Sequence, residues 1–251
     1  MRTAASRCGS RRCGTRRPGR WIRRRCSTPR RRWARSPGAG SGGRRRIRGC
    51  STAGSTGTRS PRRPRPAPAR SLAAPGPRAT ALLGDRIPAA ARLLAHQDRV
   101  RAVLEALPRT LCHHDATGAN VFADDAGIVL IDWESVGPGP VGADLASLLS
   151  SSVRRGDASV ADVTAVLDHA VVRYVSGLDA TGSAAQPDVV RRGLDAAIAL
   201  RWKLAADLVA ALDAGSAMRR GSLPDEPADR AQAELTALLD VLLAAAGRVL
   251  G

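Results

Sequence analysis

The sequence predicts an α+β domain over residues 81–251, mainly helical with a small β-hairpin, preceded by a disordered Arg-rich segment over residues 1–80. Three observations support this prediction. The C-terminal part contains long stretches with apolar residues at helical spacing. Two short apolar runs flank the turn sequence ADDAG, which is typical of a hairpin. The first 80 residues contain no acidic residue and too few apolar residues for a core.

The segment 1–80 carries 24 of the 40 basic residues and neither Asp nor Glu, so the net charge of +18 comes from it and the remainder is mildly acidic. Its large apolar side chains are too few to offset the conformational entropy of ordering the segment. Besides Met1, they are Trp21, Ile22, Trp33, Ile47 and Leu72. We therefore expect residues 1–80 to be unstructured.

Three explanations of this segment remain open. An Arg-rich arm could contact nucleic acid phosphates, but it lacks interleaved aromatics and any binding module, so we do not expect nucleic acid as a specific partner. An organellar targeting peptide fits the composition loosely, and a secretory signal is excluded by the missing apolar region. The third explanation is a GC-rich gene read out of frame, which yields mainly Arg, Pro, Gly, Ala and Ser. The composition, with Lys203 as the single lysine of the chain, favours this third explanation.

The first predicted elements of the folded part lead to a β-hairpin. Residues 82–107 have apolar side chains at helical spacing, and we expect one helix that ends at Pro108. A short strand over Thr110–Cys112 should lead into the loop that follows. Val121–Phe122 and Ile128–Ile131 are expected to form the two strands of the hairpin.

The second half of the folded part is expected to be helical. The sequence GPGP at residues 137–140 should break the chain before a helix that starts near Gly142. Three further helices are expected, over residues 157–178, 186–213 and 225–249. The last is amphipathic and is interrupted by Asp240, and no run of 18 apolar residues occurs, so we expect no membrane span and a cytoplasmic location.

The stretch LCHHDATGANVFADDAGIVLIDWE, residues 111–134, holds the candidate functional residues. Asp115 and Asn120 lie five residues apart with Gly118 between them, which indicates a loop that turns both oxygens towards one point. Asp132 ends the second strand of the hairpin and could reach the same point. Asn120 and Asp132 offer hard oxygen ligands that suit Mg²⁺, which completes its shell with phosphate and water. Asp115 could accept a proton from a substrate hydroxyl, as phosphoryl transfer requires.

The order of these motifs resembles the aminoglycoside phosphotransferase/choline kinase-like family, which has a protein-kinase-like fold. HHDATGAN resembles its catalytic loop, H-x-D-x-x-x-x-N; IDWE resembles its metal-binding strand, and GADLASLL the helix start that follows. The resemblance implies that Asp115 is the catalytic base and that Asn120 and Asp132 are Mg²⁺ ligands. It also implies that His113 braces the loop and that Asp144 is a buried carboxylate holding the loop from below.

The resemblance runs from about Leu107 to Leu149 and implies that residues 81–251 form the C-terminal lobe of such an enzyme. The implied reaction transfers the γ-phosphoryl group of ATP to a hydroxyl of a small molecule, with Mg²⁺ as cofactor. Such enzymes also need an N-terminal lobe whose Lys–Glu pair holds the phosphates, and no strand pattern, Lys or Glu precedes residue 81. We therefore expect impaired activity. The alternative is a catalytically inactive fragment, or a binding module whose basic arm contacts nucleic acid non-specifically.

Overall fold

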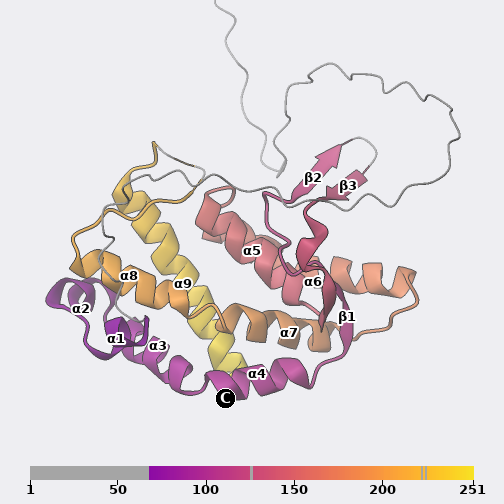
Figure 1. The fold of residues 1–251 in the computed structure, drawn as a ribbon, viewed down its shortest axis with the longest axis horizontal. Helices are drawn as coiled ribbons and strands as arrows, with labels where there is room; N and C mark the ends of the chain where they lie inside the picture. The colour runs from indigo at the N-terminus through magenta and orange to yellow at the C-terminus, as the bar shows by residue number, and fades with distance from the viewer. Residues whose placement is uncertain (1–67, 125–126, 222, 224) are drawn as a thin grey trace, which may run out of the picture. The chain divides into compact units, whose positions relative to one another are not determined.

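A computed structural model describes residues 68–124, 127–221, 223 and 225–251 of the chain (Figure 1). In this part helices predominate, and the strands form two separate two-stranded sheets, so the predicted mainly helical class with a small β element is confirmed. The helices before the strands are α1 (Pro68–Ala73), α2 (Pro77–Leu83), α3 (Arg86–Ala95) and α4 (Gln97–Glu105). The strands, with one 3-10 helix, are β1 (Arg109–Cys112), β2 (Val121–Asp124), β3 (Gly127–Leu130), η1 (Trp133–Ser135) and β4 (Gly137–Pro140). The later helices are α5 (Ala143–Arg155), α6 (Val160–Ala180), α7 (Pro187–Ala199), α8 (Lys203–Asp213) and α9 (Ala228–Leu250).

Helices α1 and α2 extend the folded part further towards the N-terminus than the sequence predicts. The prediction that the chain is unstructured through residue 80 is wrong for residues 68–73, which form α1, and for residues 77–80, which begin α2. The N–H groups of Gly76 and Ala79 donate to the Asp213 carboxylate of α8 at 2.7 and 3.1 Å. Because Asp213 lies far away in the sequence, the composition around α1 and α2 does not reveal this contact. The rest of the predicted segment, residues 1–67, lies outside the described residues.

Two long predicted helices are divided by turns. The single helix expected over 82–107 is interrupted at Gly84, with φ of 49°, and at His96, with φ of −108°. The helix expected over 186–213 is divided into α7 and α8 by the turn at residues 200–202. The apolar spacing continues through each turn, because the helices on both sides bury apolar faces in the same core. Periodicity therefore identified the helical stretches but not their breaks.

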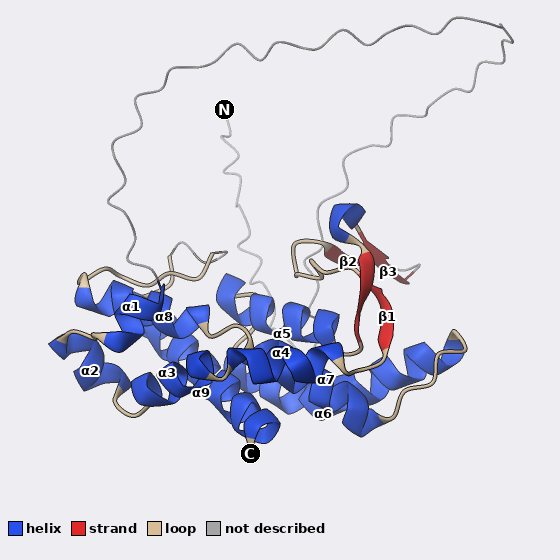
Figure 2. Ribbon diagram, turned by 60° about the horizontal axis from the view of Figure 1, so that its bottom comes forward, coloured by secondary structure: helices blue, strands red, loops and turns tan. Residues whose placement is uncertain are grey.

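The strands confirm the predicted hairpin and add a second sheet. β2 and β3 pair antiparallel as expected, while the turn residues 125–126 lie outside the described part. The prediction that GPGP only breaks the chain is wrong, since these residues form β4, which pairs antiparallel with β1. In a two-stranded sheet each strand has one side without a partner strand. Proline at positions 138 and 140 lacks an N–H group on that unpaired side of β4, so no hydrogen bond between the two strands is lost. Figure 2 shows β1, β2 and β3 grouped together.

The core is built around α7 and α9, which pack against each other and against α4, α5 and α6. Two glycines let α7 approach the start of α5. Gly142, with φ of 84°, has the Val190 carbonyl oxygen 2.5 Å from the position of a Cβ, and at Gly193 the Val141 carbonyl oxygen is 1.9 Å from that position. Because Gly142 immediately precedes α5, this contact fixes the helix end on which Asp144 lies.

The C-terminal helix α9 matches the amphipathic helix predicted over residues 225–249. Its apolar face is buried in the core, and Asp240 on the outer face forms an ion pair with Arg86 of α3 at 2.6 Å. Among the helices that the structure describes, none combines the length and the apolar character that crossing a membrane requires.

Candidate active site

The predicted site begins with a loop that a single carboxylate holds against α5. Asp144 lies in the first turn of α5, and its two oxygens accept the N–H groups of His113 at 2.6 Å and of His114 at 2.9 Å. A carboxylate is favoured there by the partial positive charge of the helix N-terminus. Both bonds are charge-assisted, and they orient the backbone at the point where β1 ends and the loop starts.

The buried imidazole of His113 connects this loop to the end of β3. The Asp115 N–H donates to Nδ1 of His113 at 3.3 Å, and Nε2 lies 2.8 Å from the Ile131 carbonyl oxygen. Because Nδ1 accepts a proton donor, Nε2 carries the ring proton and donates it to Ile131. The ring also packs against Trp133, with ring centroids 4.8 Å apart. His113 therefore contacts the two segments that carry the remaining site residues.

Asp115 and Asn120 are brought together by the loop. The Asn120 side-chain Nδ2 donates to the Asp115 carboxylate at 2.8 Å and to its carbonyl oxygen at 3.0 Å. The turn between them is closed by the Thr117 N–H on the Asp115 carbonyl at 2.8 Å and by the Asn120 N–H on the Thr117 carbonyl at 2.9 Å. Asn120 is buried whereas Asp115 is exposed, so the amide orients a carboxylate that remains open to solvent.

Asp132 is positioned through its neighbour Ile131. The Ile131 N–H donates to the Asn120 carbonyl at 3.0 Å, and the Ile131 carbonyl accepts the proton of His113. Ile131, which precedes Asp132, is therefore hydrogen-bonded to the loop through both its N–H and its carbonyl group. The Asp132 side chain is exposed, and the residue immediately precedes η1. The loop and the end of β3 form one continuous hydrogen-bonded unit.

Two site residues have a backbone conformation that non-glycine residues rarely adopt. Within the described part of the chain, positive φ values outside glycine occur at His114, 64°, and at Asp132, 66°. Left-handed geometry is costly for residues with a Cβ, and such strain is concentrated at functional sites. At position 114 glycine would adopt the same φ without the steric cost that a Cβ adds.

Replacing His114 by glycine is therefore expected to stabilise the fold. The backbone bond to Asp144 is retained, and relief of the left-handed strain outweighs the added chain entropy of glycine by about 0.5–1 kcal/mol. Chemical unfolding of the purified variant would measure the change. His96→Gly serves as the control, since His96 has negative φ and should lose stability. A loss of stability in His114→Gly as large as in His96→Gly would contradict the strain argument.

Sequence reasoning missed the support that β4 gives to this loop. A Cβ on Gly139 would lie 2.7 Å from the Cys112 sulfur and 2.7 Å from Cε1 of His114, so only glycine fits beneath the loop. The available signal was the glycine between two prolines in GPGP, but the sequence was interpreted as a chain break and not as a strand. Cys112 itself is fully buried; burial, together with the charge of Asp144, raises its pKa to about 11. At neutral pH the thiol stays protonated and packs as an apolar group.

Comparison with known proteins extends the resemblance found in the motifs. A model of the phosphotransferase enzyme family (APH) matches residues 13–180, more than half of the chain. The match includes the whole stretch 107–149 and begins within the Arg-rich segment. No curated protein and no solved structure matches the chain. The resemblance drawn from HHDATGAN, IDWE and GADLASLL is confirmed, and the chain belongs to the phosphotransferase enzyme family.

Proposed function

We propose that residues 81–251 act as the C-terminal lobe of a protein-kinase-like phosphotransferase that transfers the γ-phosphoryl group of ATP to a hydroxyl of a small molecule. The observation that carries the proposal is the 2.8 Å hydrogen bond between Asn120 and Asp115, inside a loop that Asp144 fixes to α5. Family membership supports the reaction class. The roles of the individual residues follow from their contacts.

Asp115 is proposed as the catalytic base. Its Oδ2 is held by the neutral amide of Asn120, which orients the carboxylate without neutralising its charge. The side chain is exposed, so Oδ1 is free to approach the hydroxyl of a bound substrate. A carboxylate in this position accepts the hydroxyl proton as the oxygen attacks phosphorus, and it orients the nucleophile in line.

Asn120 and Asp132 are proposed as the Mg²⁺ ligands. Among the described residues, no three His, Cys, Asp or Glu side chains form a cluster that could hold a metal by themselves. Mg²⁺ does not need one, because it commonly takes one or two protein oxygens and completes its shell with phosphates and water. Since Nδ2 of Asn120 is engaged by Asp115, its Oδ1 is the atom left for the metal. When bound, Mg²⁺ would neutralise charge on the phosphates.

A further segment is proposed to cover the face of the molecule that carries the strands and to hold the nucleotide. Seven of the nine exposed large apolar residues in the described part fall between positions 111 and 136. They are Leu111, Phe122, Ile128, Val129, Ile131, Trp133 and Val136. Exposed apolar residues gathered around one site are typical of an interaction surface. Residues 68–110 form helices and the start of β1, so this part of the chain supplies no sheet-rich lobe upstream of the site.

The 251-residue chain is therefore expected to show little or no ATP-dependent phosphotransfer, because positioning of the nucleotide supplies most of the rate in this reaction. The test compares it with the same chain joined at its N-terminus to a strand-rich lobe that holds the nucleotide. Both would be assayed for ADP release and phosphoester formation with aminoglycosides, choline and other small alcohols. Activity is expected in the extended chain alone.

Two results would count against this proposal. Robust turnover by the 251-residue chain would show that residues 1–67 hold the nucleotide themselves. Absence of turnover in the extended chain, with folding verified by circular dichroism, would favour the alternative of a catalytically inactive fragment or binding module.

A further inference from the structure

The turn between α5 and α6 lies against the loop between β1 and β2 that carries the candidate site residues. A Cβ on Gly118 of that loop would lie 2.9 Å from Oδ2 of Asp157 and 4.0 Å from Oγ of Ser152. Gly118 does not have a positive φ, so backbone conformation does not explain the glycine. The approach of Asp157 therefore accounts for a residue without a side chain at this point of the loop.

The carboxylate of Asp157 is held in place and cannot simply rotate away from Gly118. Its Oδ2, the atom that faces Gly118, accepts the Nε–H of Arg155 at 3.0 Å. The Asp157 N–H donates to the Ser152 carbonyl at 2.9 Å, and Gly156 has the φ of 80° that is common for a glycine at the end of a helix. Both the backbone and the side chain of Asp157 are therefore fixed.

The turn is also held by the buried Arg220, which belongs to the segment between α8 and α9. Nη1 of Arg220 donates to the Ala158 carbonyl at 3.0 Å, and its Nε donates to the Glu226 carboxylate at 2.8 Å. Glu234 of α9 accepts the N–H of Val160, at the start of α6, at 2.8 Å. The turn is thus hydrogen-bonded to the α8–α9 segment and to α9.

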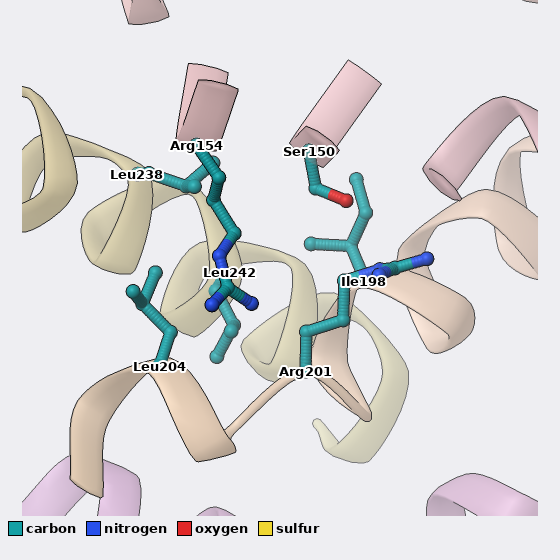
Figure 3. Close-up of a pocket in the computed structure, with 7 residues that line it drawn as sticks. All are labelled: Ser150, Arg154, Ile198, Arg201, Leu204, Leu238 and Leu242. Carbon is teal, nitrogen blue, oxygen red and sulfur yellow. The ribbon is translucent and has the colours of Figure 1, made fainter. Parts of the chain in front are cut away.

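The helix that leads into the turn is packed in the core. Figure 3 shows Ser150 and Arg154 of α5 with Ile198, Leu238 and Leu242 around a small cavity of about 10 Å³. A space of this size has room for about one water molecule, so α5 has little freedom to shift. When the turn and the loop press against each other, the loop is therefore the part that adjusts.

We propose that Asp157 is a positioning residue for the loop between β1 and β2, which its carboxylate holds in place through the contact with Gly118. The inference rests on the proposed function, since the residues positioned are the proposed base and a proposed metal ligand. The Asn120 side chain donates to both the carbonyl and the carboxylate of Asp115, so the orientation of that carboxylate depends on the shape of the turn between them. Asp157 makes that shape depend on the helical core.

The test uses the purified chain without nucleotide, metal or acceptor, and it measures the solvent exchange of the Asn120 side-chain NH₂ group by NMR. In the wild type this exchange is expected to be slow, because the group donates to Asp115. Asp157→Ala should accelerate it several-fold, since the loop loses its contact with the turn. Exchange of the α9 backbone amides should stay unchanged, which separates a local effect on the loop from a loss of global stability.

Two variants serve as controls for Asp157→Ala. Asp157→Asn keeps the size of the side chain and an oxygen that can accept the Arg155 N–H, so it should retain slow exchange at Asn120. Asp98→Ala removes a highly exposed aspartate of α4 and should also leave the Asn120 signals unchanged. Unchanged exchange at Asn120 in Asp157→Ala would overturn the proposal.

A double-mutant cycle tests the contact with Gly118 itself. Gly118→Ala should lower the midpoint temperature of unfolding by several degrees, because Arg155 keeps the Asp157 oxygen where the new methyl group has to lie. In the Asp157→Ala background the same substitution should cost much less, because the obstructing atom is gone. Equal losses in the two backgrounds would contradict the inference.

Failure of this inference is distinguishable from failure of the proposed function. The exchange and unfolding measurements require no phosphotransfer, so a negative result rejects the role of Asp157 and leaves the turnover assays unaffected. Absence of turnover in the extended chain, together with fast exchange at Asn120 in Asp157→Ala, would reject the proposed function and support the positioning of the loop by Asp157.

Discussion

Gly193→Ala is expected to lower the free energy of unfolding by at least about 3 kcal/mol, which corresponds to a fall in midpoint temperature of about 6–12 °C for a chain of this size. A Cβ at this position would lie 1.9 Å from the Val141 carbonyl oxygen and 3.1 Å from its carbonyl carbon. Both atoms are backbone, so no side chain can rotate away. Either α7 or the segment entering α5 must shift, and chemical unfolding monitored by circular dichroism would measure the loss.

Gly177→Ala is the matched control for this prediction. Gly177 lies within α6, and a Cβ there would meet no atom within 4 Å. Both substitutions gain the same helix propensity, so Gly177→Ala should be stabilised by about 0.5–1 kcal/mol. The difference between the two variants isolates the contact with Val141. If Gly193→Ala is as stable as Gly177→Ala, then α7 and the start of α5 do not approach as described.

Asp115→Asn is expected to lower kcat by about 10²–10⁴-fold in a chain extended by a nucleotide-holding lobe. The substitution keeps the size of the side chain and an oxygen that can accept the Asn120 amide, but it removes the group that takes the substrate proton. The loop contacts of His113 and Asp144 involve the backbone and remain. Steady-state kinetics should therefore show a loss in kcat with little change in KM for ATP.

The control for Asp115→Asn is Asp98→Asn, a highly exposed aspartate on α4 whose side chain is 90% accessible. It should retain wild-type turnover. Equal kcat for Asp115→Asn and wild type would show that another group is the base. A parallel rise in KM for ATP would instead assign Asp115 to nucleotide binding.

The local part of the site was predictable because the motif lies within one short stretch of sequence. The spacing of Asp115 and Asn120 around Gly118 predicted a loop that turns both side chains together, and the hydrogen bond between them agrees with this. The hairpin that delivers Asp132 was predictable from the ADDAG turn between two apolar runs. In each case the interaction that forms the structure is encoded by neighbouring residues.

The features that the sequence did not reveal depend on contacts between distant segments. β4 was missed because GPGP has no strand propensity, and its pairing with β1 depends on the fit of Gly139 beneath Cys112 and His114. Similarly, the N-terminal limit of the fold was misplaced because α2 is held by Asp213 of α8. Composition and periodicity describe one segment at a time, so they cannot report such partners.

The loop after β1 and the end of β3 are proposed to form one site for metal-bound phosphate. The most direct test is paramagnetic broadening of backbone amide resonances when Mn²⁺, a substitute for Mg²⁺, is added in substoichiometric amounts with ATP. This measurement detects weak binding, which is expected because the nucleotide phosphates supply most of the metal's ligands. We predict selective broadening at Asn120 and at residues 131–133, and its loss in Asp132→Ala. Broadening centred elsewhere, or unchanged in Asp132→Ala, would contradict this account of the site.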